Sequence, residues 1–259
     1  MLRRLGRAAG ALAVVAMTAA GAPAPAAAEG ICQRLTHAGN GYVVCTVPAA
    51  QEPNLQLWLK GADGQVLGQF DRISATLPQG RALAFAMNAG MYHEDRSPVG
   101  LMAVDGTEIS PLVTAGGGGN FGMLPNGVFC TGGKRPFQVI ESRAFAKAKP
   151  DCRLATQSGP MLLLDGQLHP RFLADSTSRY VRNGVGVDDK GQVAWFAISD
   201  RPVTFYEFAM MFRDGLGARD ALYFDGSISR LHAPGLGRSD RGRLMGPVIG
   251  LVGDTAQGS

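Results

Sequence analysis

The chain has 259 residues, of which 46% are hydrophobic and 18% are charged, which is enough apolar material for one sizeable core. Its formal net charge is +4, but three of these charges come from Arg3, Arg4 and Arg7 near the amino terminus. Without the first 28 residues, 22 basic residues face 21 acidic residues. This near balance, without basic clusters, argues against nucleic acid or an anionic membrane surface as a partner.

Residues 1–28 have the pattern of a secretory signal peptide. The three arginines are followed by an apolar run over residues 8–20 and by three alanines at 26–28 that suit a cleavage site. An uncleaved membrane anchor is the alternative, but the apolar run is short for a bilayer and no later segment reaches that length. We therefore predict export to the periplasm or secretion, with residues 29–259 as one mature domain that has no integral membrane segment.

The four cysteines all follow the predicted signal peptide. In an exported chain, this even number favours two disulfides over free thiols. Three pairings are conceivable, and we favour the two that close short local loops. A metal site is the weaker alternative, because the chain has no Cys-x-x-Cys pair. The favoured pairs are Cys32–Cys45 and Cys130–Cys152.

The first half of the chain predicts short strands joined by tight turns. Residues 31–47 have the pattern of a hairpin that turns at Asn40-Gly41, and a second pair is expected from residues 55–59 and 65–70. The glycine run at 116–119 predicts a loop and no phosphate-binding motif, since no Lys-Ser/Thr follows it. Further strands are expected over residues 82–87, 99–104, 128–129 and 137–140.

The second half of the chain is more regular. A strand that opens with polar residues 156–158 ends in the Asp165-Gly166 turn, and residues 184–187 and 193–198 predict a hairpin. Residues 204–216 predict a helix that begins with a capping box and leads into the strand that ends at Asp225. The pattern therefore predicts a single sheet-rich domain of the α+β or mixed α/β class, with few helices.

Four polar clusters fall at the ends of predicted strands, and they are the candidates for chemistry. The chain has no Gly-x-Ser-x-Gly and no His-Glu-x-x-His, which disfavours a serine esterase and a zinc protease. Its four histidines are isolated, although His93 and His232 lie close to motif strands. The clusters are residues 88–92, 156–158, 182–184 and 225–227.

These clusters, in this order, resemble the motifs of the phosphodiester glycosidase family, which contains the lysosomal uncovering enzyme and bacterial exported proteins. The resemblance covers about residues 80–252. Ala89 stands where the family has a glycine, and Ser227-Ile228 stand where many members have two glycines, so less room remains for a ligand near the backbone. The matching stretches are Asn-Ala-Gly-Met-Tyr at 88–92, residues 98–101, 158–160 with 165–166, 182–186 and 225–229.

The resemblance implies cleavage of a glycosidic bond whose aglycone is a phosphate ester. Such a reaction needs stabilisation of an oxocarbenium-like sugar and of the departing phosphate. Asp225 is then the expected nucleophile or general base, Arg182 the phosphate ligand through bidentate hydrogen bonds, and Ser227 a ligand of sugar or phosphate. The other substrate-binding residues that it implies are Asn88, Tyr92, Gln157, Ser158 and Asn183.

Alternatives remain open for several of these residues. Glu207 is a candidate second carboxylate, but it also fits the capping box, and Asp165 fits a hairpin turn. Asp225 has the same turn alternative, and Arg182 has the alternative of a buried ion-pair partner. No cofactor or metal is indicated; Ca²⁺ would suit an acidic site but has no support in the pattern.

Two functions follow. The first is an exported glycosidase that acts on sugar phosphodiesters or a related envelope or extracellular glycan. The second is a non-catalytic envelope protein that binds carbohydrate or peptidoglycan with the same fold. The presence of both Asp225 and Arg182 favours the enzyme, whereas the changed glycines keep the binding protein in view.

Overall fold

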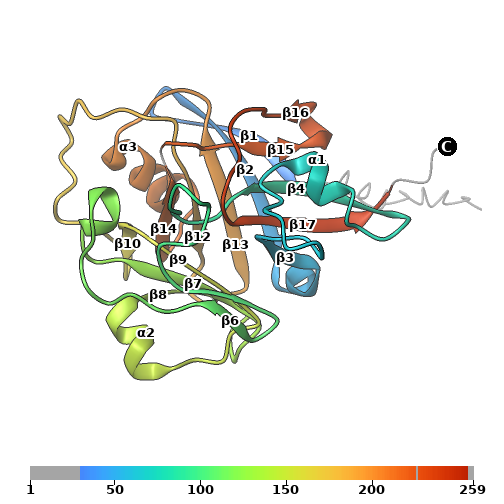
Figure 1. Ribbon diagram of the computed structural model, residues 1–259. Helices are drawn as coiled ribbons and strands as arrows, with labels where there is room; N and C mark the ends of the chain where they lie inside the picture. Colours follow the sequence, from blue (N-terminus) through green and yellow to red (C-terminus); the bar gives the residue numbers. More distant parts are fainter. Residues whose placement is uncertain (1–29, 226, 256–259) are drawn as a thin grey trace, which may run out of the picture.

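The computed structural model describes residues 30–225 and 227–255, so the predicted signal peptide lies outside the described residues. Within them, the chain forms three antiparallel sheets (Figure 1). The largest has seven strands in the order β1 (Cys32–His37), β2 (Asn40–Pro48), β13 (Val193–Ser199), β12 (Asn183–Val187), β14 (Asp220–Asp225), β10 (Met161–Leu164) and β11 (Gln167–Leu168).

The two smaller sheets have five strands each, and we name them after their central strands. The β4 sheet has the order β16 (Arg238–Ser239), β15 (Leu231–Ala233), β4 (Arg81–Asn88), β17 (Val248–Asp254) and β3 (Leu55–Trp58). The β9 sheet has the order β6 (Thr107–Ser110), β5 (Met102–Val104), β9 (Leu154–Ser158), β7 (Gly127–Thr131) and β8 (Phe137–Glu141).

The helices are short and lie on the outer faces of the sheets. The α-helices are α1 (Phe70–Ser74), α2 (Ser142–Ala148) and α3 (Phe205–Met210), and a π-helical turn (Met211–Gly215) extends α3. Three 3₁₀ turns complete the described helical structure: Ala49–Asn54, Gly119–Gly122 and Pro234–Leu236. The prediction of a sheet-rich domain with few helices is confirmed, but the fold is mostly β, so the α+β label holds only roughly.

One apolar core joins the three sheets. Strand β2 shows how it forms, because Val43, Cys45 and Val47 face this shared core, whereas Tyr42 and Val44 face α3. Alternate residues of a strand point to opposite faces, so both faces of the seven-stranded sheet are buried.

Three aromatic rings mark the point where the sheets meet. Phe196 of β13 packs against Phe85 of β4 and Phe129 of β7, with ring centroids 5.2 and 5.5 Å apart. Each ring belongs to a different sheet. Their contact therefore ties the three sheets together at the centre of the molecule.

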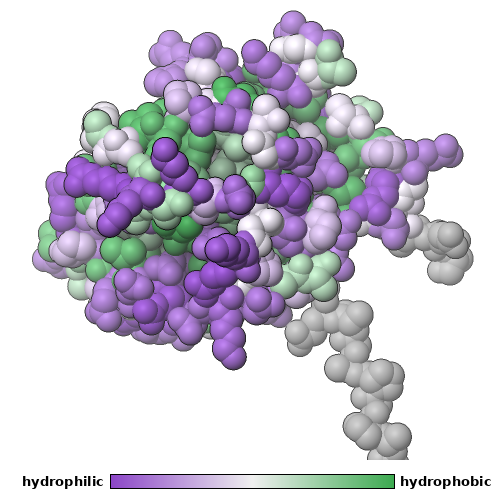
Figure 2. Space-filling model, turned by 90° about the horizontal axis from the view of Figure 1, so that it is seen from below, coloured by the Kyte–Doolittle hydropathy of each residue, from purple (hydrophilic) through white to green (hydrophobic). Residues whose placement is uncertain are grey.

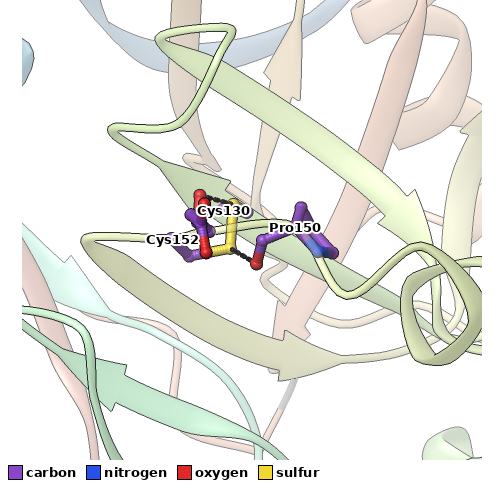
Figure 3. Close-up of a disulfide and its surroundings, with 4 residues drawn as sticks. Cys130, Pro150 and Cys152 are labelled. Atoms are coloured by element: carbon purple, nitrogen blue, oxygen red, sulfur yellow. Dashed lines mark hydrogen bonds between the residues drawn. A yellow bond between two sulfur atoms is a disulfide. The ribbon is translucent and has the colours of Figure 1, made fainter.

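The two predicted disulfides are both present. Cys32–Cys45 joins directly paired residues of β1 and β2, and Cys130–Cys152 joins β7 to the segment before β9 (Figure 3). They span 13 and 22 residues of sequence. Loops of this length are each expected to stabilise the fold by about 3 kcal/mol through the unfolded state.

The first half of the chain departs from prediction in three places. The first hairpin turns at Ala38-Gly39, both with positive φ, so Asn40 already belongs to β2. Residues 65–70 form no strand: Val66 makes an isolated bridge with Lys60, and Phe70 begins α1, because its side chain is buried on the outer face of the β4 sheet. Strand β5 begins at residue 102 rather than 99.

The face of the molecule seen from below is mainly hydrophilic (Figure 2). The face shown in Figure 2 carries mostly hydrophilic residues around smaller hydrophobic areas. No helix within residues 30–225 or 227–255 is both long and apolar enough to cross a membrane. The large hydrophobic side chains that are exposed in the described structure are Ile109, Leu164, Leu173 and Tyr180.

Candidate active site

A cleft of about 540 Å³ opens where β14 ends, and we call it the Asp225 cleft. Three other segments complete it: residues 91–93 after β4, residues 118–121 before β7, and residues 227–228 after β14, with Val99 beside them. The cleft is large enough for a sugar with a substituent. The predicted site residues that line it are Tyr92, Asp225 and Ser227.

The half-buried Asp225 is held at the edge of the sheet by its neighbours. Its Oδ1 accepts a hydrogen bond from the backbone N–H of Ser227 at 2.8 Å, and its backbone carbonyl accepts one from Ser229 Oγ at 2.7 Å. The turn interpretation is therefore confirmed, and the same carboxylate lines the cleft. The turn bond fixes the orientation of the carboxylate.

Tyr92 places a polar group in the wall of the same cleft. Its hydroxyl is buried and has no hydrogen-bond partner among the described residues. The ring packs against the backbone at Gly246, where a Cβ would lie only 2.5 Å from the Tyr92 Cγ. Burial, and then the nearby Asp225 carboxylate, raise the pKa of Tyr92 to about 12. At neutral pH the side chain is therefore a neutral hydrogen-bond donor held next to Asp225.

Several residues of the cleft have no counterpart among the predicted site residues. The glycine run contributes Gly118 and Gly119, and it is followed by Asn120, whose amide can bond a sugar hydroxyl. His93 also lines the cleft. A glycine run indicates a loop, but it carries no information about which distant strand end the loop approaches.

Asn88 and Asn183 lie behind the cleft and are completely buried. Asn183 Nδ2 donates to the Asn88 carbonyl at 2.8 Å, and Asn88 Oδ1 accepts from the backbone N–H of Arg230 at 2.9 Å. Ser229 Oγ approaches Asn183 Oδ1 at 3.3 Å. These side chains thus bond the end of β4 to the start of β12 and to the segment after β14, and in this structure they do not reach the open cleft.

Gln157 and Ser158 are also buried and also connect backbone segments. Gln157 Oε1 accepts from the backbone N–H groups of Leu101 and Val113, both at 3.0 Å. Ser158 Oγ donates to the carbonyl of Phe224 at 2.8 Å, directly before Asp225. Both residues therefore support the cleft from behind rather than line it.

Arg182 is 1% exposed and does not line the Asp225 cleft. Its Nε donates to the Val203 carbonyl at 2.9 Å and its Nη2 to the Ser178 carbonyl at 3.1 Å, while the guanidinium lies 3.6 Å from the Phe205 ring centroid. Burial lowers its pKa. In the described part of the chain, its contacts are with backbone carbonyls and aromatic rings, and its Nη1 is buried without a hydrogen-bond partner.

Glu207 lies on α3 and forms the predicted capping box with Thr204. Its carboxylate also pairs with Arg179, with contacts of 2.8 and 3.0 Å. Burial acts to raise the pKa of Glu207, but the bonds from the Thr204 backbone and from Arg179 outweigh it and lower the pKa. The capping interpretation is confirmed, and Glu207 is not among the residues that line the Asp225 cleft.

Asp165 forms the turn between β10 and β11. Its φ of 52° and that of Gly166, 74°, are the left-handed values of a tight hairpin, and its carboxylate pairs with Arg219 at 3.0 Å. Among residues 30–225 and 227–255, no three His, Cys, Asp or Glu side chains gather closely enough to hold a metal ion.

The motif-bearing strand ends lie within a segment that matches a known family. The model of the phosphodiester glycosidase family matches residues 81–233, more than half of the chain. The chain belongs to this family. The uncharacterized Escherichia coli (strain K12) protein YigE is 33% identical over 185 residues, which cover 71% of this chain and 72% of YigE.

The comparison with solved structures gives two matches. The zebrafish N-acetylglucosamine-1-phosphodiester alpha-N-acetylglucosaminidase catalytic domain, auto-inhibited by its pro-peptide, has a TM-score of 0.59 at 14% identity, over 85% of this chain and 81% of that domain. A putative exported protein of Burkholderia pseudomallei K96243 has a TM-score of 0.49 at 12% identity, over 82% and 74%. At such identities, the zebrafish domain supports the fold alone.

Proposed function

We propose that this protein is an exported glycosidase that hydrolyses the glycosidic bond of sugar phosphodiesters or of a related envelope or extracellular glycan. One observation carries the proposal: the Asp225 carboxylate lies at the end of β14 in a sugar-sized cleft, within the segment that matches the phosphodiester glycosidase family. The two disulfides and the predicted signal peptide support export.

In the proposed reaction, Asp225 acts as nucleophile or general base at the anomeric carbon. A phosphate ester is a good leaving group, because its oxygen is only weakly basic once the bond breaks. A strong general acid is therefore not required, and hydrogen-bond donors that hold the departing phosphate contribute more. Ser227 is exposed in the cleft and can donate to that phosphate or to the sugar, with the buried and protonated Tyr92 hydroxyl in the wall behind it.

A non-catalytic carbohydrate-binding protein is the second candidate, and one observation favours it. Among the described residues that line the cleft, Asp225 is the single carboxylate, whereas most glycosidases use two. A binding protein needs only the cleft and its donors. The departing phosphate removes the need for the second carboxylate, and for this reason we rank the enzyme first.

The test is hydrolysis of a panel of chromogenic and nucleotide-linked sugar phosphodiesters by the protein and by Asp225→Asn. Release of free sugar by the unmodified protein alone supports the glycosidase and the role of Asp225. Glycan binding by both proteins without turnover replaces the enzyme with the binding protein. Turnover by Asp225→Asn at an unchanged rate removes Asp225 from the mechanism.

A further inference from the structure

A second cleft, of about 510 Å³, adjoins the Asp225 cleft, and we call it the arginine cleft. The two clefts meet at one short segment, because Ser227 and Ile228 line both of them. A ligand that occupies the Asp225 cleft can therefore continue past Ile228 into the arginine cleft. The side chain of Ile228 gives both clefts an apolar wall at this point.

The described charged side chains that line the arginine cleft are all positive. Arg230, Arg241 and Arg243 line it, and none of its described lining residues is acidic. Arg241 and Arg243 are exposed, and in the described part of the chain their guanidinium groups have neither a hydrogen bond nor an ion pair. In contrast, the nearby Arg238 is paired with Asp200 and Asp240. The two cleft arginines are thus available to an anion.

Arg230 holds the backbone that carries these two arginines. It is nearly buried, and its guanidinium donates to the carbonyls of Asp240 and Arg243 at 2.7 to 3.2 Å and to Gln69 Oε1 at 2.9 Å. These bonds fix the loop at both ends of residues 240–243. The loop is therefore held in place before a ligand binds, which lowers the entropy cost of binding.

We propose that the arginine cleft binds a second phosphate of the ligand through Arg241 and Arg243. The inference rests on the proposed function for the ligand of the Asp225 cleft, and it makes the preferred substrate a phosphate-bearing polymer or oligomer rather than a single sugar phosphodiester. Guanidinium groups bind phosphate oxygens with paired hydrogen bonds, and a cleft without carboxylates concentrates anions. With Arg182 buried, these two arginines supply the exposed cationic charge that borders the Asp225 cleft.

The experiment measures binding by calorimetry at low salt, using a glycerol phosphate trimer as the probe. Arg241→Gln/Arg243→Gln is compared with a matched control, Arg143→Gln/Lys147→Gln. The control removes two exposed charges from α2, which Figure 1 shows at the opposite end of the molecule from β15 and β16. We expect the affinity of the cleft variant to fall about tenfold or more, and that of the control to stay within about twofold.

A second probe distinguishes phosphate from carboxylate as the bound group. A galacturonate trimer carries carboxylates instead of phosphates, and binding as tight as that of the glycerol phosphate trimer would overturn the assignment to phosphate. Equal losses in both double variants, or no binding by the unmodified protein, would overturn the site itself. Because binding is measured without turnover, these outcomes are independent of whether Asp225 catalyses hydrolysis.

Discussion

The polar side chains at the strand ends occupy two regions that differ in exposure. Asp225, Tyr92 and Ser227 line an open cleft, whereas Asn88 and Asn183 lie in a buried layer directly behind it. Gln157, Ser158 and Arg182 share the buried character. The family motifs thus contain both residues that line the cleft and residues that hold the strand ends in place. Substitutions in the cleft should mainly lower turnover, whereas substitutions in the buried layer should mainly lower the free energy of unfolding.

The largest effect is expected from Asp225→Asn. If Asp225 is nucleophile or general base, kcat/KM for a cleaved phosphodiester falls by about 10³-fold, which corresponds to about 4 kcal/mol of transition-state stabilisation. The asparagine keeps the turn oxygen that accepts from Ser227, so the free energy of unfolding should change by less than about 1 kcal/mol. Steady-state kinetics and denaturant unfolding give the two values. A large loss of stability would mean that Asp225, like the residues of the buried layer, mainly stabilises the fold.

Arg182→Met should show the opposite pattern. The exchange removes two hydrogen bonds to carbonyls and the contact with the Phe205 ring, and we expect a loss of about 3 kcal/mol in the free energy of unfolding. Denaturant unfolding measures the loss, with the exposed Arg201→Met as the matched control. Unchanged stability together with weaker substrate binding would restore Arg182 as a phosphate ligand.

Asn88→Ala tests the buried layer itself. Without the side chain, the backbone N–H of Arg230 loses its acceptor, and an unsatisfied buried donor costs about 2 kcal/mol of unfolding free energy. At temperatures well below the unfolding transition, turnover should fall much less than in Asp225→Asn, because Asn88 acts only through the position of the segment after β14. Full retention of stability would mean that another acceptor, such as water, replaces the amide.

The smallest effect is expected from Glu207→Gln, and it should depend on pH. The pKa of Glu207 is lowered in the folded protein, so its contribution is present above the unfolded-state pKa and is lost as pH falls. At pH 7 we expect the free energy of unfolding of Glu207→Gln to be about 1 kcal/mol below that of the unmodified protein. Between pH 7 and pH 3, the variant should lose less stability than the unmodified protein does. The exposed Glu108→Gln is the control. A drop in kcat without a change in this pH dependence would return Glu207 to the catalytic residues.

Local signals were sufficient for part of this fold. The capping box at Thr204, the strand predicted over residues 82–87 and the two disulfides follow from neighbouring residues or short loops. All are present, the strand with one more residue at each end. The buried layer could not be separated from the cleft in this way. Arg182 is buried because Val203 and Phe205, about 20 residues later, pack over it, and no local pattern contains that contact.

The arginine cleft could not be predicted from local sequence either. Arg241 and Arg243 follow the last family motif by more than ten residues, and an exposed arginine pair in a loop indicates nothing by itself. Their position becomes informative only when Arg230 fixes the loop beside Ser227 and Ile228. Contacts between segments that are far apart in the chain thus decide which charged residues border the candidate site.

The junction of the three sheets has a consequence for how the protein loses activity under denaturing conditions. Asn88 ends a strand of the β4 sheet, Ser158 ends one of the β9 sheet, and Asp225 ends one of the seven-stranded sheet. A partly unfolded form that kept only two sheets would have no assembled cleft. The three sheets share one apolar core, so we expect them to unfold together. The proposed activity should then be lost along the same denaturant curve as the global fold.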